Sequence, residues 1–303
     1  MALIRLPFEL PAFSRVTWAS ADIRATWQDR LSRLARALAA PLRPSRWGGI
    51  LPAQIAVLYL HQEPAWAAEA AALGLAALRI EPPDPGAIDA VTALPGEPTD
   101  PDLATGKCLL VAIGAPDAAE AARRAVLAGD RTALAAATGI PACCAAHAER
   151  MARLLVRSPE LALALASGAE TTAGGRVARA QVWQTNAFWR SLGIAALPHA
   201  PCALDCAPSL ALAGALHARM TEARLPDEAA WLAEVLSWSM SWSALHGIAE
   251  LKTPLFKAAA RTDATADRYE LHLHGGFPAD GATGVGFPYR APRTRMRLPL
   301  APA

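Results

Sequence analysis

Apolar positions recur with a helical period near the start of the chain. Within residues 20–40, apolar side chains are spaced three and four apart, and Pro41 follows. These side chains are Ile23, Trp27, Leu31, Leu34 and Leu38. The pattern predicts an amphipathic helix with one face against a hydrophobic core.

Two short apolar runs are each followed by a segment rich in strong helix formers. Residues 54–60 and 107–114 predict buried strands, because continuous apolar runs of this length are typical of strands covered on both faces. The helical segments begin after Pro64 and at Pro116, and Asp117 suits the first turn of the second one. Two successive strand–helix units favour a small, mainly parallel sheet with helices against it.

The middle of the chain, from about residue 131 to 250, has the pattern of helices with no convincing strand. We predict helices over 151–167, 176–192, 207–224 and 227–250. One apolar stripe in the last of these is expected in the core, and it comprises Trp231, Val235, Trp238, Trp242 and Leu245.

Towards the end of the chain, Tyr269, Leu271 and Leu273 alternate with polar residues before a turn-rich segment. This alternation predicts a C-terminal β-hairpin. The predicted fold is therefore α/β (α+β), with a small, mainly parallel sheet, a large helical region and this hairpin. We expect one compact unit divided into an N-terminal helix and α/β region at 1–130, a helical cysteine-motif region at 131–255, and the hairpin and tail at 256–303.

Composition limits the classes of function that the chain supports. Its 303 residues are 53% hydrophobic and 18% charged, which is typical of a well-buried globular protein. The 29 basic and 27 acidic residues nearly cancel, so we expect no nucleic-acid partner and no binding to an anionic membrane. The first residues do not resemble a signal peptide, and no stretch is apolar enough to span a bilayer. Five cysteines, an odd number, differ from a secreted disulfide framework, and we expect a cytoplasmic protein.

Four of the five cysteines lie in two short motifs about sixty residues apart, GIPACCAAH and HAPCALDC. In the first motif, Pro141 suits the opening position of a helix and places Cys143 and Cys144 in its first turn. In the second motif, a helix that begins near Pro208 has Cys206 at its start, with Cys202 on the preceding loop. Unpaired N–H groups and the helix dipole stabilise thiolates at such positions.

These motifs predict a metal centre. The spacing of three and four residues between His199, Cys202 and Cys206 lets them converge as the chain enters a helix. Soft sulfur and imidazole ligands suit zinc or an iron–sulfur cluster and suit magnesium or calcium poorly. The candidate ligands are Cys143, Cys144, His199, Cys202 and Cys206.

The motifs leave the ligand set and the cofactor open. Adjacent cysteines are unusual in zinc ribbons, which favours an iron–sulfur cluster slightly, or a site where only one of Cys143 and Cys144 is a ligand. Three thiolates with His199 are a further possibility. A redox-active thiol pair and buried cysteines that only pack are alternatives without a metal. Packing alone is the interpretation for Cys108, which lies within an apolar strand.

The residues around both motifs resemble the uncharacterised prokaryotic domain of unknown function 483 family. The resemblance covers roughly residues 107–210, with an apolar strand ending in glycine, a short helix containing aspartate, G-x-P-x-C-C and H-x-P-C-x-x-x-C. The chain departs from that pattern at Ile140, where an aromatic residue is usual. The family carries no established reaction, so the resemblance implies only that the four clustered cysteines and His199 belong to one pattern.

A second candidate site combines His246, Glu250 and Lys252 near the end of a predicted helix. These residues could transfer protons, and Lys252 with Lys257 could bind a substrate carboxylate. Ordinary ion pairing at a solvated helix end is the alternative. The sequence thus predicts a metal or iron–sulfur protein that acts as an enzyme on a small-molecule substrate, or else a non-enzymatic protein whose structural zinc supports the binding of a partner. Its oligomeric state is not indicated.

Overall fold

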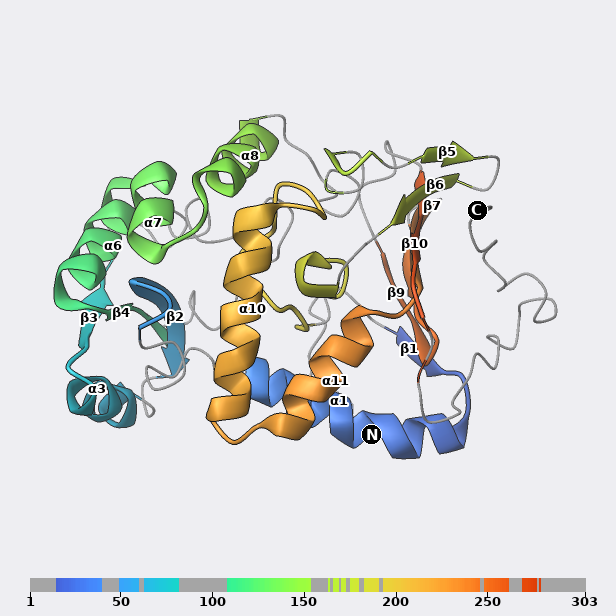
Figure 1. The fold of residues 1–303 in the computed structure, drawn as a ribbon, viewed down its shortest axis with the longest axis horizontal. Helices are drawn as coiled ribbons and strands as arrows, with labels where there is room; N and C mark the ends of the chain where they lie inside the picture. Colours follow the sequence, from blue (N-terminus) through green and yellow to red (C-terminus); the bar gives the residue numbers. More distant parts are fainter. Residues whose placement is uncertain are drawn as a thin grey trace.

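The computed structural model describes residues 15–39, 49–59, 63–81, 108–153, 163, 166–168, 170–172, 175–179, 183–190, 193–245, 248–261, 269–276 and 278. Within these residues the chain forms a three-stranded and a seven-stranded sheet, with helices packed against both (Figure 1). None of the described helices combines the length and the apolar composition that crossing a bilayer requires.

The three-stranded sheet has the order β2-β4-β3, with β2 at Ala53–Tyr59, β4 at Cys108–Gly114 and β3 at Ala76–Ile80. Helix α3 (Glu63–Ala72) covers one face, while α6 (Pro116–Ala128) and α7 (Arg131–Thr138) cover the other. The predicted strands at 54–60 and 107–114 are confirmed, as is the helix that begins at Pro116.

The prediction of a mainly parallel sheet is wrong, because β4 pairs antiparallel with both β2 and β3. The segment after Pro64 contains a strand as well as a helix, since α3 ends at Ala72 and Gly74 turns the chain, with φ of 70°, towards β3. Strands β2 and β3 do run in the same direction, as a strand–helix–strand unit requires. However, β4 inserts between them and makes every pairing in this sheet antiparallel.

The seven-stranded sheet has the order β1-β9-β8-β7-β10-β6-β5. Its strands are β1 (Arg15–Trp18), β9 (Phe256–Arg261), β8 (Ile248–Lys252), β7 (Met240–Leu245), β10 (Tyr269–His274), β6 (Gly175–Arg179) and β5 (Glu170–Thr172). Only β10 and β6 pair in parallel among these strands. The fold class is therefore α+β, with two mainly antiparallel sheets.

Helices pack against one face of the seven-stranded sheet. They are α1 (Ala21–Ala39), α10 (Ala207–Glu222) and α11 (Pro226–Leu236), with a short 3-10 turn at Trp183–Thr185. The predicted helices at 20–40 and 207–224 are confirmed. The C-terminal hairpin is not formed by β10, because this strand is interior and its two neighbours, β7 and β6, come from earlier in the chain.

Two of the predicted helices are wrong in whole or in part. Residues 176–192 contain β6 and the 3-10 turn, and the helix predicted over 227–250 ends at Leu236, before β7 and β8. Trp238 and Trp242 fit a helical stripe, but they also alternate with serines at the period of a strand. Pairing of β7 with β8 and β10 stabilises the strand conformation here. Both indoles are buried, as the helical stripe predicted.

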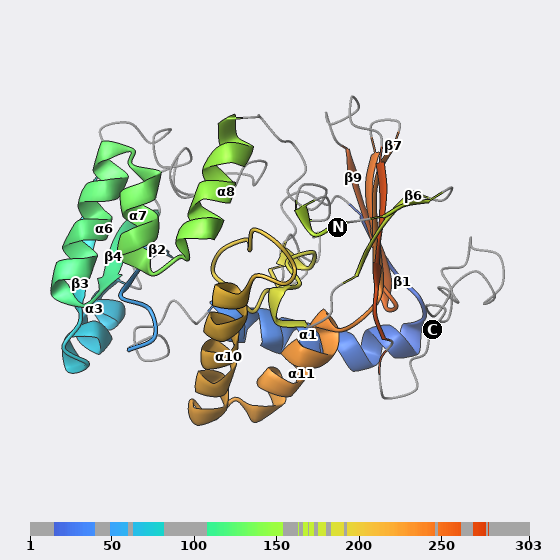
Figure 2. The ribbon, with the colours of Figure 1, turned by 45° about the horizontal axis from the view of Figure 1, so that its top comes forward.

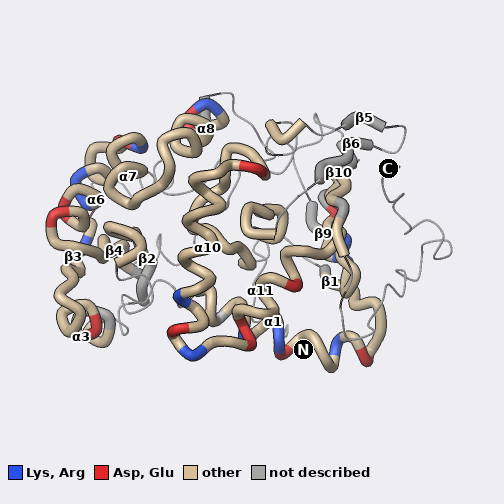
Figure 3. Tube along the Cα trace, in the orientation of Figure 1, with Lys and Arg blue, Asp and Glu red and all other residues tan. Residues whose placement is uncertain are grey.

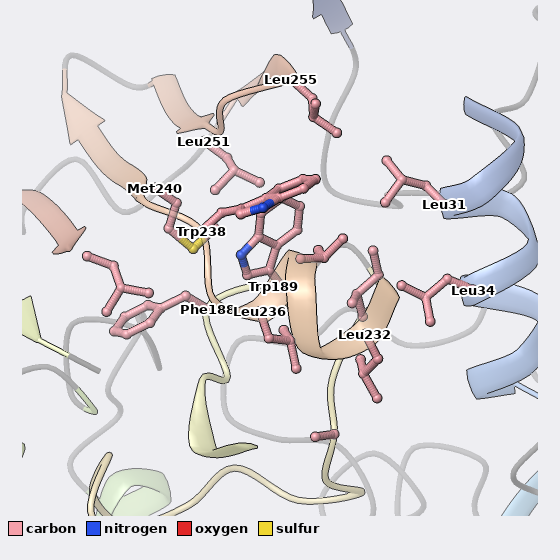
Figure 4. Packing of buried hydrophobic residues seen from close by; sticks show 14 of the residues in the cluster. Leu31, Leu34, Phe188, Trp189, Leu232, Leu236, Trp238, Met240, Leu251 and Leu255 are labelled. Atoms are coloured by element: carbon pink, nitrogen blue, oxygen red, sulfur yellow. The ribbon is translucent and has the colours of Figure 1, made fainter. Parts of the chain in front are cut away.

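The two sheets have separate cores. In the small-sheet unit (β2, β3, β4, α3, α6 and α7), the described buried residues are mainly alanines with a few leucine, isoleucine and valine residues. In the large-sheet unit (β1, β5–β10, α1, α10 and α11), the core includes Trp27, Trp189 and Trp238 among many leucines. Figure 4 shows Trp189 and Trp238 with the leucines around them. The division of the chain at residues 130 and 255 stays a prediction.

Candidate metal centre

Four thiols from two separate parts of the chain meet at one point. Cys143 and Cys144 lie in the first turn of α8 (Ala142–Arg153), Cys206 directly precedes α10 at its N-cap position, and Cys202 lies on the loop before it. The Sγ atom of Cys206 is 3.7 Å from that of Cys143 and 3.6 Å from that of Cys144. All four Sγ atoms lie within 4.8 Å of one another, so these cysteines could hold a metal ion.

The two helix starts predicted for the motifs are confirmed. Helix α7 ends at Thr138, and the next residue, Gly139, turns the chain towards Pro141 with its φ of 74°. The carbonyl of Pro141 accepts hydrogen bonds from the N–H groups of Cys144 and Ala145. Likewise, the carbonyl of Cys206 accepts the first hydrogen bond of α10, from Leu210. Each pair of thiols therefore lies where a helix dipole favours negative charge.

The centre lies between the two units. Helix α8 packs beside α7, and the loop before α10 curls over the start of that helix, near α8 (Figure 2). Cys144 and Cys206 are buried, Cys202 is half-buried and Cys143 is exposed. The centre is therefore exposed to solvent at Cys143 and enclosed by protein at Cys144 and Cys206.

Ser209 completes the polar surroundings of the buried thiol Cys144. Its side chain is fully buried, and its Oγ lies 3.2 Å from the Sγ of Cys144. The N–H of Cys202 donates to the same sulfur at 3.3 Å. Two donors can therefore stabilise a thiolate here. Ser209 was not predicted from the sequence, although its position three residues after Cys206 places both on one helical face.

Burial and hydrogen bonding give the thiols different acidities. Burial raises the pKa of Cys144 to about 11, against the effect of the donors Ser209 and Cys202. Burial likewise raises the pKa of Cys202, together with the charge of Cys144. For Cys206, burial is the largest influence and acts upwards, but hydrogen bonds from Ser209 and from neighbouring thiols outweigh it and lower the pKa to about 7. Of these three thiols, Cys206 loses its proton most readily.

His199 lies outside the set of four sulfurs. Its Nε2 is 3.0 Å from the Oγ of Ser209, so the ring reaches Cys144 through the serine hydroxyl. Burial, with a smaller contribution from Arg190, lowers the pKa of His199 to about 4 and keeps the ring neutral. A neutral ring that donates from Nε2 leaves the serine hydroxyl free to donate to the thiolate. The position of His199 favours support of the centre through Ser209 over direct ligation.

Two further residues near the centre have structural partners. Arg190 donates to the carbonyls of Leu197 and Pro198 and so holds the segment that leads to His199. His147, on α8, is buried, and its Nδ1 lies 3.1 Å from the guanidinium of Arg150. Burial, followed by the charge of Arg150, lowers the pKa of His147.

The second predicted site does not lie at a helix end. Glu250 and Lys252 are on β8, and Lys257 is directly opposite Lys252 on β9. The carboxylate of Glu250 is 3.0 Å from Nζ of Lys252 and also pairs with Lys257. One carboxylate therefore lies between two ammonium groups, on strands rather than on a helix. His246 and the side chain of Cys108 lie outside the described residues, and a catalytic role for Glu250 and Lys252 stays a prediction.

Charge on the described helices is dispersed. Basic and acidic residues are interspersed along the helices of both units (Figure 3). Some of them form local ion pairs, such as Arg123 with Glu120 on α6 and Arg219 with Glu222 on α10. These pairs are solvent-exposed and contribute little to stability.

The chain was compared with models of protein families, with curated proteins and with solved structures, and none of them matches significantly. The resemblance to the domain of unknown function 483 family stays a prediction.

Proposed function

We propose that this protein binds a single Zn²⁺ ion through Cys143, Cys144, Cys202 and Cys206, and that the ion has a structural role, joining α8 to the start of α10. The observation that carries the proposal is the separation of the sulfur atoms. The Sγ–Sγ distances among Cys143, Cys144 and Cys206 are 3.6, 3.7 and 3.9 Å. Four ligands at about 2.3 Å from one tetrahedral zinc ion stand about 3.8 Å apart.

The same distances favour one ion over an iron–sulfur cluster. In a cluster, several irons and inorganic sulfides stand between the cysteine ligands, so the thiolates lie farther apart than those that share one ion. Here all four sulfurs are within 4.8 Å of one another. Both members of the tandem pair Cys143 and Cys144 are close to Cys206, which supports four thiolate ligands over three.

A closed tetrahedral site supports a structural role. Catalytic zinc keeps one coordination position open for water or substrate, whereas structural zinc is bound by four protein ligands. The proposed ion also joins parts of the chain that are 62 or 63 residues apart and lie between two separate cores. A structural link between these parts of the chain is therefore the role that the geometry favours.

The charge of the complex fits its surroundings. Four thiolates around Zn²⁺ carry a net charge of minus two, which must be stabilised in a largely buried place. The N-termini of α8 and α10, the N–H of Cys202 and the hydroxyl of Ser209 all direct positive dipole ends towards the sulfurs.

Metal analysis of the protein purified without air tests this proposal. We expect about one zinc per chain, no iron, and no broad absorbance at about 400 nm. Replacement of zinc by Co²⁺ should give the strong thiolate charge-transfer and visible bands of a tetrahedral site. Stoichiometric iron with sulfide would contradict the proposal.

Variants make the test specific. Cys144→Ser should bind zinc much more weakly, because it removes the most buried ligand. Cys108→Ser is the matched control, since Cys108 lies on β4 and is not among the four clustered cysteines. Equal zinc content in both variants would count against the assigned ligands.

A further inference from the structure

We propose that the zinc centre is also an oxidation site, at which a peroxide converts Cys143 and Cys206 to a disulfide and zinc is released. The inference rests on the proposed zinc site and adds a reaction to it. It is carried by the unequal exposure of the four thiols and by the distances between them.

Exposure selects the thiol that reacts first. The side chain of Cys143 is exposed at the start of α8, whereas Cys144 and Cys206 are 1% and 7% exposed. The sulfur of Cys144 is further covered by Ser209 and by the backbone of Cys202. A small oxidant that approaches from solvent therefore meets Cys143. Susceptibility to oxidation follows thiolate character and exposure, and zinc supplies the thiolate character.

Distance and helix geometry favour Cys206 over Cys144 as the second thiol. The Sγ of Cys206 is 3.7 Å from that of Cys143, and the Sγ of Cys144 is 3.9 Å away. Adjacent residues on a helix point in different directions, so a Cys143–Cys144 bond would distort the first turn of α8. Cys206 comes from another element and can approach without that distortion.

The reaction consumes one peroxide for each disulfide. The thiolate of Cys143 attacks hydrogen peroxide, so an S–O bond forms, the O–O bond breaks and hydroxide leaves, giving a sulfenic acid. The thiolate of Cys206 then attacks this sulfur, so the S–S bond forms, the S–O bond breaks and a second hydroxide leaves. Two protons convert the hydroxides to water, and the two sulfurs have lost two electrons to the peroxide. Zinc stays Zn²⁺ and keeps only two of its ligands, Cys144 and Cys202.

Oxidation exchanges one link between the helices for another. Before the reaction α8 and α10 are joined through the ion, and afterwards they are joined by the Cys143–Cys206 bond. The oxidised chain should thus stay folded while its zinc is lost, unlike a chain from which a chelator removes the ion. Reduction by a thiol in the presence of zinc should restore the original centre.

The experiment uses the full-length zinc-loaded chain, and its metal content is measured first. Hydrogen peroxide is then added with a chromogenic zinc chelator, and disulfides are mapped by mass spectrometry. Cleavage before Asp205 separates Cys202 from Cys206, and fragmentation between Cys143 and Cys144 distinguishes the tandem pair. We expect one zinc released for each Cys143–Cys206 disulfide, and rebinding of zinc after reduction.

Cys206→Ser removes the second thiol and keeps three ligands. In this variant, the sulfenic acid of Cys143 should persist and be labelled by a 1,3-diketone reagent. A Cys144–Cys202 disulfide, or a zinc-loaded chain that retains its zinc in peroxide, would overturn the oxidation site and leave the zinc proposal intact. Absence of zinc before peroxide is added would count against the proposed function itself.

Discussion

The small-sheet and large-sheet units differ in what their cores contain. The described core of the small-sheet unit is mainly alanine, with leucines such as Leu110, while the core of the large-sheet unit includes Trp27, Trp189 and Trp238. Burial of apolar surface contributes about 25 cal/mol per Å², so an alanine core contributes less per residue than a core of large aromatic and aliphatic side chains. The difference indicates that the small-sheet unit depends more on its links to the rest of the chain.

The tryptophans in the core of the large-sheet unit also contact one another. Trp27 and Trp238 meet edge to face with ring centroids 4.8 Å apart, and Trp189 contacts Trp238 at 6.0 Å. The indole of Trp242 donates to the carbonyl of Phe188. These contacts join α1, the segment after the 3-10 turn, β7 and the residues between α11 and β7. In our proposal, the zinc ion at the four-cysteine centre provides the corresponding link for the small-sheet unit.

Removal of zinc should have the largest effect and should act unequally on the two units. We expect a chelator to lower the free energy of unfolding by at least about 4 kcal/mol, which is the value for a ligand present at a thousandfold excess over its Kd. Hydrogen exchange should quicken in α6, α7 and α8 before it changes in β7, β8 and β9. An equal loss of protection in both units would contradict the comparison.

Two matched leucine truncations test whether the two units unfold separately. Leu110 and Leu251 are 2% and 0% exposed and lie on central strands of the small and large sheets. With zinc bound, Leu110→Ala and Leu251→Ala should each cost about 3 kcal/mol, within the usual range for a buried leucine. After chelation, only Leu110→Ala should show a separate early transition in thermal unfolding. Coincident single transitions for both variants would show that the units unfold together.

Much of the four-cysteine centre could be predicted from short sequence motifs. Pro141 and Pro208 mark helix starts, and the cysteines at those starts were expected to converge. The sequence could not distinguish three thiolates with His199 from four thiolates, because that choice depends on distances between elements. Ser209 was missed because a serine near a helix start usually acts as a cap, whereas here its hydroxyl lies beside Cys144 and His199.

The sheets were less predictable for a physical reason. Strand pairing is decided by contacts between segments distant in sequence, and neither the insertion of β4 between β2 and β3 nor the interior position of β10 leaves a local signal. In residues 238–243, large apolar residues alternate with serine and also match a helical stripe. When both periods fit, burial against the rest of the core determines the structure.

The pH dependence of zinc binding should reveal which unit the ion supports. Since burial raises the pKa values of Cys144 and Cys202, both thiols must lose a proton when zinc binds at neutral pH. Affinity should therefore rise with pH, by at least about 100-fold per pH unit. Below pH 7 the dependence should steepen, because Cys206, with its pKa of about 7, then releases a proton as well.

Competitive titration against a chelator, from about pH 6 to pH 9, measures this slope. As acid removes zinc, the small-sheet unit should lose hydrogen-exchange protection while the large-sheet unit retains it. A pH-independent zinc affinity would mean that the thiols are already ionised without metal, contrary to the burial of Cys144.

Replacing Ser209 should have the smallest effect of these changes, and it should weaken zinc binding without altering the seven-stranded sheet. Ser209→Ala removes the hydroxyl that lies between Cys144 and His199, and we expect zinc to bind about tenfold more weakly, the lower end for loss of a group that supports a ligand. Ser239→Ala is the matched control, because Ser239 is also buried but bonds to Gly275 in the large-sheet unit. That variant should lower stability and leave zinc affinity unchanged. If both substitutions lowered zinc affinity equally, the effect would reflect a general loss of stability. The polar contact from Ser209 to the thiolate would then not determine metal binding.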